Sequence, residues 1–140
     1  MKTVLGIITD NGKILIGKLK PEQLEAFGGI EYVFPGGKIE NEEGSTDAVI
    51  REIREETGLD TVIIKKIGER VHPKTLKEME YYHCKKVSGE ETTASSENND
   101  IDRLMWVNLN ELFNYMPSLF PKVKEYLDEL AKSEERLNKS

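Results

Sequence analysis

Residues 36–59 read GGKIENEEGSTDAVIREIREETGL, and this stretch predicts a loop followed by a helix. The apolar residues Val49, Ile50 and Ile53 recur at helical spacing. Gly58 stands where a left-handed residue is expected after the last turn of a helix. The stretch therefore predicts a helix from residue 45 to residue 57 that buries one apolar face.

The same helix carries Glu52, Glu55 and Glu56 at positions i, i+3 and i+4. Residues at this spacing lie on one helix face, about 5 to 6 Å apart. Carboxylates so close raise each other's pKa unless a cation lies between them. With no His or Cys nearby, oxygen ligands favour Mg²⁺ or Mn²⁺, and Mg²⁺ held by few carboxylates leaves positions for waters and phosphate oxygens. A solvated glutamate-rich face is the alternative for these residues taken alone.

Residues before and within the helix could support such a metal site. Gly36 and Gly37 allow close backbone approach, so a carbonyl oxygen there could be a further ligand. Arg51 lies one turn before Glu55, and Glu43 precedes the helix. An arginine between carboxylates would fix their side-chain conformations.

Outward from this stretch, β-branched and aromatic runs predict strands on both sides. Two runs, 4–9 and 13–19, flank Asp10-Asn11-Gly12 and indicate a β-hairpin. Further strands are expected at 31–34, 62–67, 79–87 and 104–107, and Pro35-Gly36-Gly37 is expected to end the first of them. The segment from Ser88 to Asp102 has no periodicity and is expected to be a long loop.

The C-terminal part predicts helices. Asn108 and Glu111 have the spacing of a capping box for a short helix, and a longer amphipathic helix is expected from about Leu119. Residues 133–140 are polar enough to fray. The order of elements predicts an α/β fold with a mixed sheet packed between helices, in a single domain of residues 1–132.

Composition limits the classes of partner. The 140 residues include 26 Asp and Glu against 20 Lys and Arg, a net charge of -6, so a stable nucleic-acid partner is not expected. The one cysteine, Cys84, forms no internal disulfide, which suits the cytoplasm. The N-terminal apolar run is too short for a signal or a membrane span, so no membrane partner is expected.

One spacing pattern is more specific than any of these features. It consists of Gly37, five residues, Glu43, seven residues, Arg51-Glu52-Ile53, one residue, Glu55-Glu56, one residue and Gly58-Leu59. This pattern resembles the Nudix box of the Nudix hydrolase family at every defined position. The resemblance implies an α/β/α sandwich with a mixed β-sheet. It also implies hydrolysis, with Mg²⁺ or Mn²⁺, of a nucleoside diphosphate linked to another group, by attack of water on phosphorus.

The resemblance also implies roles for individual residues. It makes Glu52, Glu55, Glu56 and the carbonyl of Gly36 the metal ligands, with Glu52 a candidate to deprotonate or orient the water, and Arg51 and Glu43 as the residues that hold the glutamates. Many family members carry another acidic residue in the loop before the last strand. Glu97 is the first candidate here, with Asp100 and Asp102 as alternatives.

Substrate contacts are expected from Gly37, Lys38 and Phe34. A base could stack on Phe34 or on one of four other rings, although each is also a candidate for the core or the sheet surface; these are Phe27, Tyr32, Tyr81 and His83.

Three functions stay open. The small size resembles the MutT-like branch, which hydrolyses nucleoside triphosphates, often oxidised ones, to a monophosphate and pyrophosphate. Pro73, fifteen residues after Gly58, has a spacing similar to that of relatives that cleave ADP-ribose, although a turn proline explains it equally well. ADP-ribose or dinucleotide hydrolysis is therefore the second hypothesis, and a sensor that binds nucleotide without turnover is the third. Homodimers are common in the family, so a homodimer is also an expectation.

Overall fold

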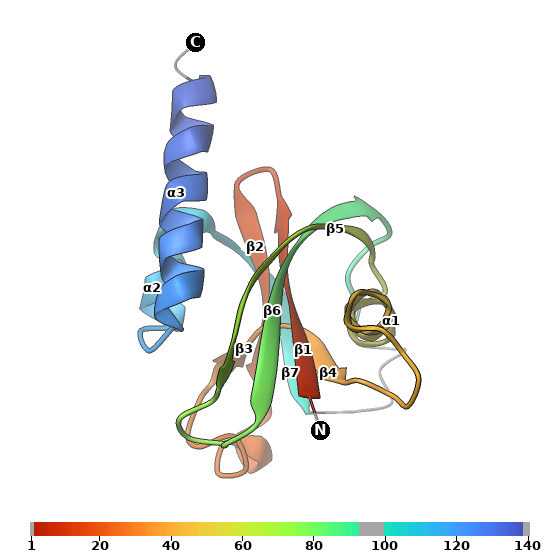
Figure 1. The fold of residues 1–140 in the computed structure, drawn as a ribbon. Coiled ribbons are helices and arrows are strands. Elements are labelled where there is room, and N and C mark those ends of the chain that lie inside the picture. Colours follow the sequence, from red (N-terminus) through yellow and green to blue (C-terminus); the bar gives the residue numbers. More distant parts are fainter. Residues whose placement is uncertain (1, 93–99, 139–140) are drawn as a thin grey trace.

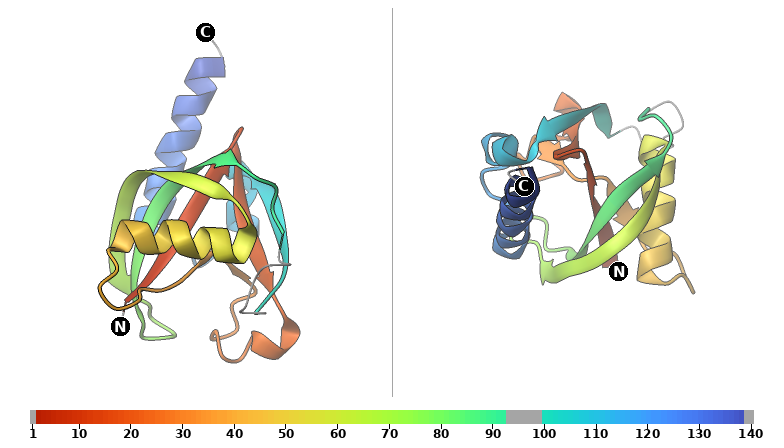
Figure 2. Two further views of the ribbon diagram at one scale, coloured as in Figure 1. Left: turned by 90° about the vertical axis from the view of Figure 1, so that its right-hand side faces the viewer. Right: turned by 90° about the horizontal axis from the view of Figure 1, so that it is seen from above.

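The computed structural model describes residues 2–92 and 100–138, and it has three layers (Figure 1). A mixed sheet lies between α1 on one face and α2 and α3 on the other (Figure 2). The strands are β1 (Lys2–Asp10), β2 (Lys13–Leu19), β3 (Tyr32–Val33), β4 (Gly36–Lys38), β5 (Asp60–Val71), β6 (Glu78–Ser88) and β7 (Ile101–Asn108). The helices are α1 (Ser45–Thr57), α2 (Leu112–Tyr115) and α3 (Pro121–Asn138), with short 3₁₀ turns at Pro21–Gln23 and Leu109–Glu111. The predicted α/β/α sandwich is confirmed.

The strand order is β3-β2-β1-β6-β5, while β4 pairs with β1 and β7 pairs with β2. The β1 and β6 strands are parallel, and the other pairs are antiparallel. The predicted hairpin joins β1 to β2. Its turn residues Asn11 and Gly12 have φ values of 49° and 76°, as a two-residue turn of this kind requires.

Two apolar clusters fill the space between the layers, one on each face of the sheet. Under α1, Val49 and Ile53 pack with Val4 of β1. On the other face, Ile7 of β1 belongs to the cluster that includes Val123 of α3. Because side chains alternate along a strand, β1 supplies apolar residues to both faces and lies at the centre of the fold. Among the described helices, none is long and apolar enough to cross a membrane.

The expected strand at 31–34 does end before Pro35, because β3 covers Tyr32–Val33, but a further strand follows that the sequence did not predict. Residues 36–38 form β4, which pairs with β1 in the register Val4↔Gly37. A Cβ atom on Gly36 would overlap the carbonyl oxygen of Val4, so the glycine is needed for the close approach of the two strands. Here the Pro-Gly-Gly signal marks a bend between two short strands, β3 and β4.

The capping box expected from Asn108 and Glu111 is not formed, so this prediction is wrong. Asn108 makes no side-chain capping bond, and the chain passes first through the 3₁₀ turn, where the Leu109 amide donates to the Gly12 carbonyl at 3.0 Å. The long helix α3 continues to Asn138, and the expected fraying from residue 133 stays a prediction. The domain limit of residues 1–132 stays a prediction.

Truncating the core under α1 should destabilise the protein. Ile53 is fully buried, and the backbone of Gly6 makes room for its side chain. We expect Ile53→Ala to lower the free energy of unfolding by about 2 to 5 kcal/mol, because it leaves a cavity. Val62→Ala, at a position that is 47% exposed, is the control and should cost less than about 1 kcal/mol in urea denaturation. Equal losses in the two variants would contradict the assignment of this core.

Candidate metal and substrate site

The glutamate face of α1 lies against β4. The amide of Gly36 donates to Glu56 Oε2 at 3.4 Å, and a Cβ atom on Gly37 would overlap the carboxyl group of Glu52. The two glycines therefore allow the close backbone approach that the sequence predicts, because without side chains they let β4 come within contact distance of the carboxylates. The helix ends at Gly58, whose φ of 78° is the left-handed conformation expected there.

The Arg51 side chain holds the outer carboxylates of this face in place. It makes a two-point pair with Glu43, with N–O distances of 2.7 and 2.9 Å, and its Nη1 lies 3.0 Å from an oxygen of both Glu52 and Glu55. Its Nη2 also donates to the Lys38 carbonyl of β4 at 3.2 Å. Arg51 engages one oxygen each of Glu52 and Glu55, so the second oxygen of each remains available to a cation.

The pKa values report the same crowding. The hydrogen bond from Arg51 lowers the pKa of Glu43 to about 2, and its carboxylate partners raise the pKa of Arg51. Burial raises the pKa of Glu52 and raises that of Glu56 to about 8. The negative charges of Glu52, Asp100 and Glu55 add to the rise at Glu56, while the Gly36 amide opposes it.

These donors fit a hard divalent cation. Burial and, to a smaller extent, the neighbouring carboxylates raise the pKa of Glu56, and a divalent cation would favour its charged form against both. As the side chains stand, no group of three or more His, Cys, Asp or Glu among the described residues is already arranged around a common point. Arg51 already bonds one oxygen each of Glu52 and Glu55, and the Gly36 amide bonds one oxygen of Glu56. The metal-ligand roles of these glutamates and of the Gly36 carbonyl therefore stay a prediction.

A cavity of about 730 Å³ opens beside this face. The glutamates Glu52, Glu55 and Glu56 line one end of it. The walls are largely aromatic and apolar, and they include Phe27, Tyr32, Phe34, Tyr81, Tyr115 and Phe120. A volume in the range of small-molecule sites, with carboxylates at one end, is what a nucleotide site needs.

Most of the substrate-contact residues expected from the sequence reach this cavity. Phe34, Gly37 and Lys38 line it, with the Phe34 side chain buried and Lys38 exposed. Pro73 also lines the cavity and begins the turn between β5 and β6. Its position is therefore compatible both with a turn proline and with a residue of the substrate site. Their contacts with a substrate stay predictions.

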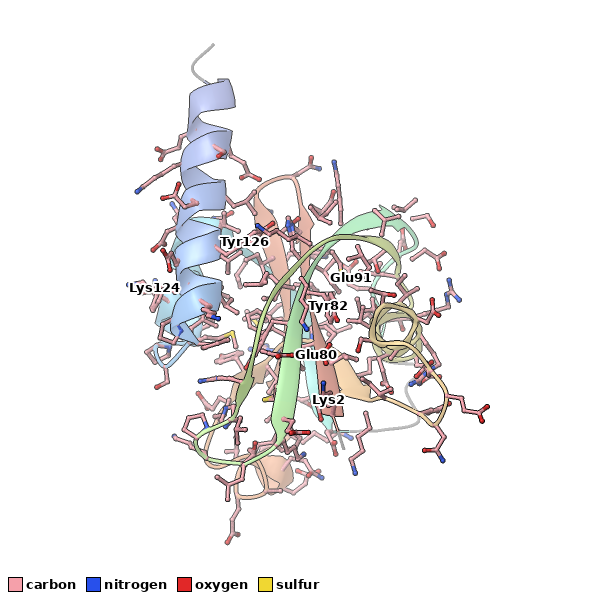
Figure 3. All side chains as sticks on the ribbon, in the orientation of Figure 1. Lys2, Glu80, Tyr82, Glu91, Lys124 and Tyr126 are labelled. Carbon is pink, nitrogen blue, oxygen red and sulfur yellow. The ribbon has the colours of Figure 1, made fainter. Side chains whose placement is uncertain are left out.

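His83 is not among the lining residues. Its Nε2 lies 2.8 Å from the Thr9 hydroxyl and its Nδ1 lies 2.7 Å from the Tyr126 hydroxyl, in two hydrogen bonds. Figure 3 shows Tyr126 on the side of α3 that faces the sheet. Of the two alternatives for His83, the structure supports a position in the core over stacking on a base, because its ring is buried and joins α3 to the sheet.

The structure describes two of the three candidates for the acidic residue in the loop before the last strand. Glu97 lies outside the described residues, so its role stays a prediction. Asp100 lines the cavity and is close enough for its charge to raise the pKa of Glu56, whereas Asp102 is exposed and does not line the cavity. Of the two described acids, Asp100 is the one that the fold brings to the glutamates.

Among the cavity residues that were not anticipated from the sequence are Arg70, Tyr115 and Phe120. The Arg70 guanidinium lies 4.6 Å from the centre of the Phe120 ring, and its Nε donates to the Tyr81 hydroxyl at 3.2 Å. Only the pairing of β5 with β6 and the position of α3 bring these residues together, so no local pattern in the sequence marks them.

Fold and site together define a sandwich with a carboxylate-bearing helix at one end of a cavity. A sequence profile described as the NUDIX domain matches residues 1–130. The chain therefore belongs to the NUDIX family, which confirms the resemblance noted from its box. Members of this family generally need divalent metal ions.

Individual relatives agree with this assignment. The chain is 38% identical to the CTP pyrophosphohydrolase of Escherichia coli (strain K12) over 63 residues, which are 45% of this chain and 44% of that protein, so the match spans less than half of this relative. Its fold is similar to that of the MutT protein from Methanosarcina mazei Go1, with a TM-score of 0.67 and 20% identity over 100% of this chain and 96% of that one. It is also similar to an ADP-ribose pyrophosphatase from Streptococcus suis 89-1591, with a TM-score of 0.59 and 19% identity over 78% and 74% of the two chains.

Replacing Arg51 should weaken metal binding. We expect Arg51→Lys to lower the affinity for Mn²⁺ by about 10- to 100-fold, because a lysine cannot hold Glu43 at two points while also fixing Glu52 and Glu55. Isothermal titration calorimetry measures this. The matched control is Arg54→Lys on the same helix, where the exposed arginine pairs only with Asp60 among the described residues. Unchanged affinity in Arg51→Lys, or equal losses in both variants, would contradict this role.

Proposed function

We propose that this protein is a Mg²⁺- or Mn²⁺-dependent hydrolase of a nucleoside diphosphate linked to another group. Its first substrate class is the nucleoside triphosphates, oxidised ones included, which it would cleave to a monophosphate and pyrophosphate. The observation that carries the proposal is the position of Glu52, Glu55 and Glu56 at one end of a 730 Å³ cavity with aromatic walls. The name of the Escherichia coli relative, a CTP pyrophosphohydrolase, supports this class.

Each residue of the site would have a separate role in the proposed hydrolysis. Glu52, Glu55, Glu56 and the Gly36 carbonyl would hold the cation, which when bound neutralises diphosphate charge and lowers the pKa of a coordinated water. Glu52 would orient or deprotonate the attacking water, since it is half-buried at the cavity wall. Arg51 and Glu43 would keep Glu52 and Glu55 in position. Gly37, Lys38 and Phe34 would contact the substrate, and an acid from the last loop, Glu97 or Asp100, would assist.

Two observations support a second candidate, hydrolysis of ADP-ribose or a dinucleotide. Pro73 lines the cavity, and one similar structure is that of a protein named ADP-ribose pyrophosphatase. The sensor hypothesis has less support, because every defined position of the box is present. A cytoplasmic location, a homodimer and the lack of a stable nucleic-acid partner remain proposals from the sequence.

Product analysis distinguishes the three candidates. The protein is incubated with Mg²⁺ and a panel of nucleoside triphosphates, ADP-ribose and dinucleotides, and the products are separated by anion-exchange chromatography. A monophosphate with pyrophosphate from a triphosphate supports the first candidate. A monophosphate with ribose 5-phosphate from ADP-ribose supports the second. Binding without hydrolysis across the panel would support the sensor and overturn both enzymatic readings.

Neutralising Glu52 should remove nearly all turnover. We expect Glu52→Gln to lower kcat by at least about 100-fold, because an amide holds Mg²⁺ weakly and accepts no proton from the water. Glu69→Gln, at an exposed carboxylate outside the cavity, makes the same chemical change and is the control. Circular dichroism checks that both variants fold. Wild-type rates in Glu52→Gln would show that the assigned mechanism is wrong.

A further inference from the structure

The end of the cavity furthest from the glutamates is basic. The lining residues Arg70, His72, Lys74 and Lys77 all come from the end of β5 and the turn that leads to β6. We call these four residues the β5–β6 basic cluster. In a chain with a net charge of -6, the two ends of one cavity thus carry opposite charge.

Strand register separates the two ends. Arg70 pairs with Met79 of β6, Met79 with Thr3 of β1, and Thr3 with Lys38 of β4, and all four residues line the cavity. They therefore form one row across four strands. Three strand spacings amount to about 14 Å, which is longer than a pyrophosphate group alone. The strands that carry the two groups of residues are therefore far enough apart for the cluster to face a different part of the substrate from the group at the glutamates.

Within the part of the chain that the structure describes, no acidic side chain is paired with the cluster. Among the described residues, no ion pair joins Arg70, Lys74 or Lys77 to a carboxylate, although Glu31 also lines the cavity. Arg70 lies over the Phe120 ring and uses its Nε in the bond to Tyr81, and its two terminal nitrogens bond to none of the residues that the structure describes. A guanidinium held in this way presents the planar pair of donors that suits a phosphate.

The turn itself is held in one conformation. The His72 Nδ1 accepts the amides of Lys74 and Thr75 at 3.1 and 3.3 Å, so the proton of the neutral ring lies on Nε2 and can be donated. Burial and the charges of Arg70, Lys74 and Lys77 lower the pKa of His72, which marks a positive local potential. The Thr75 hydroxyl is buried at this wall with no hydrogen-bond partner among the described residues.

A second loop closes this end of the cavity. The Lys74 Nζ donates to the Gly28 carbonyl at 3.4 Å, and the Lys77 ammonium lies 5.6 Å from the centre of the Phe27 ring. Phe27 belongs to the segment between β2 and β3, which lines the cavity beside the turn. The two lysines are therefore placed at the cavity wall by contacts that leave their charge unneutralised.

We propose that the β5–β6 basic cluster binds a second phosphate of the substrate, a phosphate ester on the part of the molecule furthest from the scissile pyrophosphate. This inference rests on the proposed function and narrows its substrate class. It favours nucleoside diphosphate derivatives whose far end carries a phosphomonoester over those that lack one. The alternative, that the cluster only surrounds an uncharged base or sugar, is an outcome of the test.

Matched substrate pairs that differ by one phosphomonoester test the proposal. The pairs are NADP⁺ with NAD⁺, coenzyme A with its 3′-dephospho form, and GTP 3′-phosphate with GTP. Wild-type protein should show a KM at least about tenfold lower for the phosphorylated member of one pair or more, with a smaller change in kcat. In Lys74→Gln/Lys77→Gln the ratio of the two KM values should fall to near one. Lys13→Gln/Lys85→Gln removes the same charge from exposed positions outside the cavity and should keep the ratio.

Binding measurements keep this test separate from the test of hydrolysis. Calorimetric titration of the same pairs, with Ca²⁺ in place of Mg²⁺, reports affinity whether or not the protein turns the compounds over. A preference in affinity without any hydrolysis would support the cluster and overturn the proposed function. Hydrolysis with equal KM and equal affinity in every pair, within a factor of two, would overturn the cluster and leave the proposed function standing. An equal loss of preference in both double variants would also overturn it.

Discussion

The Arg51 guanidinium is surrounded by the carboxylates of Glu43, Glu52 and Glu55 and by the Lys38 carbonyl. A single cation thereby offsets a concentration of negative charge that would otherwise weaken α1, since carboxylates one turn apart repel each other. The same contacts tie the loop before α1 and the strand β4 to the helix. The loop, the strand and the glutamate face are therefore joined to one another at this residue.

Glu56 differs from the other glutamates because Arg51 does not reach it in the structure. It is the most deeply buried of the three, and its neighbours are the Gly36 amide, Glu52, Glu55 and Asp100. Burial is the main cause of its raised pKa, and the charges of the neighbouring carboxylates add to the rise. A divalent ion beside Glu56 would stabilise the charged carboxylate. The arrangement therefore favours metal binding at the point where the substrate diphosphate would lie.

The charges along the cavity differ between its two ends, which bears on how a substrate would be oriented at this site. Its acidic end is suited to a phosphate chain that arrives with a metal ion, whereas its basic end at Arg70 and Lys74 is suited to an anion without one. Next to Arg70, rings such as Tyr81 and Phe120 provide surface for a base or a sugar. The opposite polarity of the two ends would orient an elongated substrate in one direction.

Sequence patterns predicted the parts of the molecule that are local. The helix from Ser45 to Thr57 and the hairpin at Asn11 and Gly12 follow from periodicity and turn chemistry over a few residues. The glutamate face follows from the same periodicity. These features could be read without knowing where any distant residue lies.

Features that depend on pairing distant segments were missed or misplaced. The strand β4 forms because Gly36 fits against the Val4 carbonyl, a contact between residues far apart in the chain. Arg70 reaches the cavity through the register of β5 on β6. His83 carries no pattern that separates a ring in the substrate cavity from one bonded to Thr9 and Tyr126.

The most direct test of the central claim is a crystal structure of the protein with Mg²⁺ and a substrate analogue whose scissile pyrophosphate cannot be hydrolysed. The account predicts Mg²⁺ about 2.1 Å from carboxylate oxygens of Glu52 and Glu56, with phosphate oxygens completing its coordination. It also predicts that Arg51 still holds Glu43. A pyrophosphate group bound away from the α1 glutamates, with no cation against Glu52 or Glu56, would contradict the account.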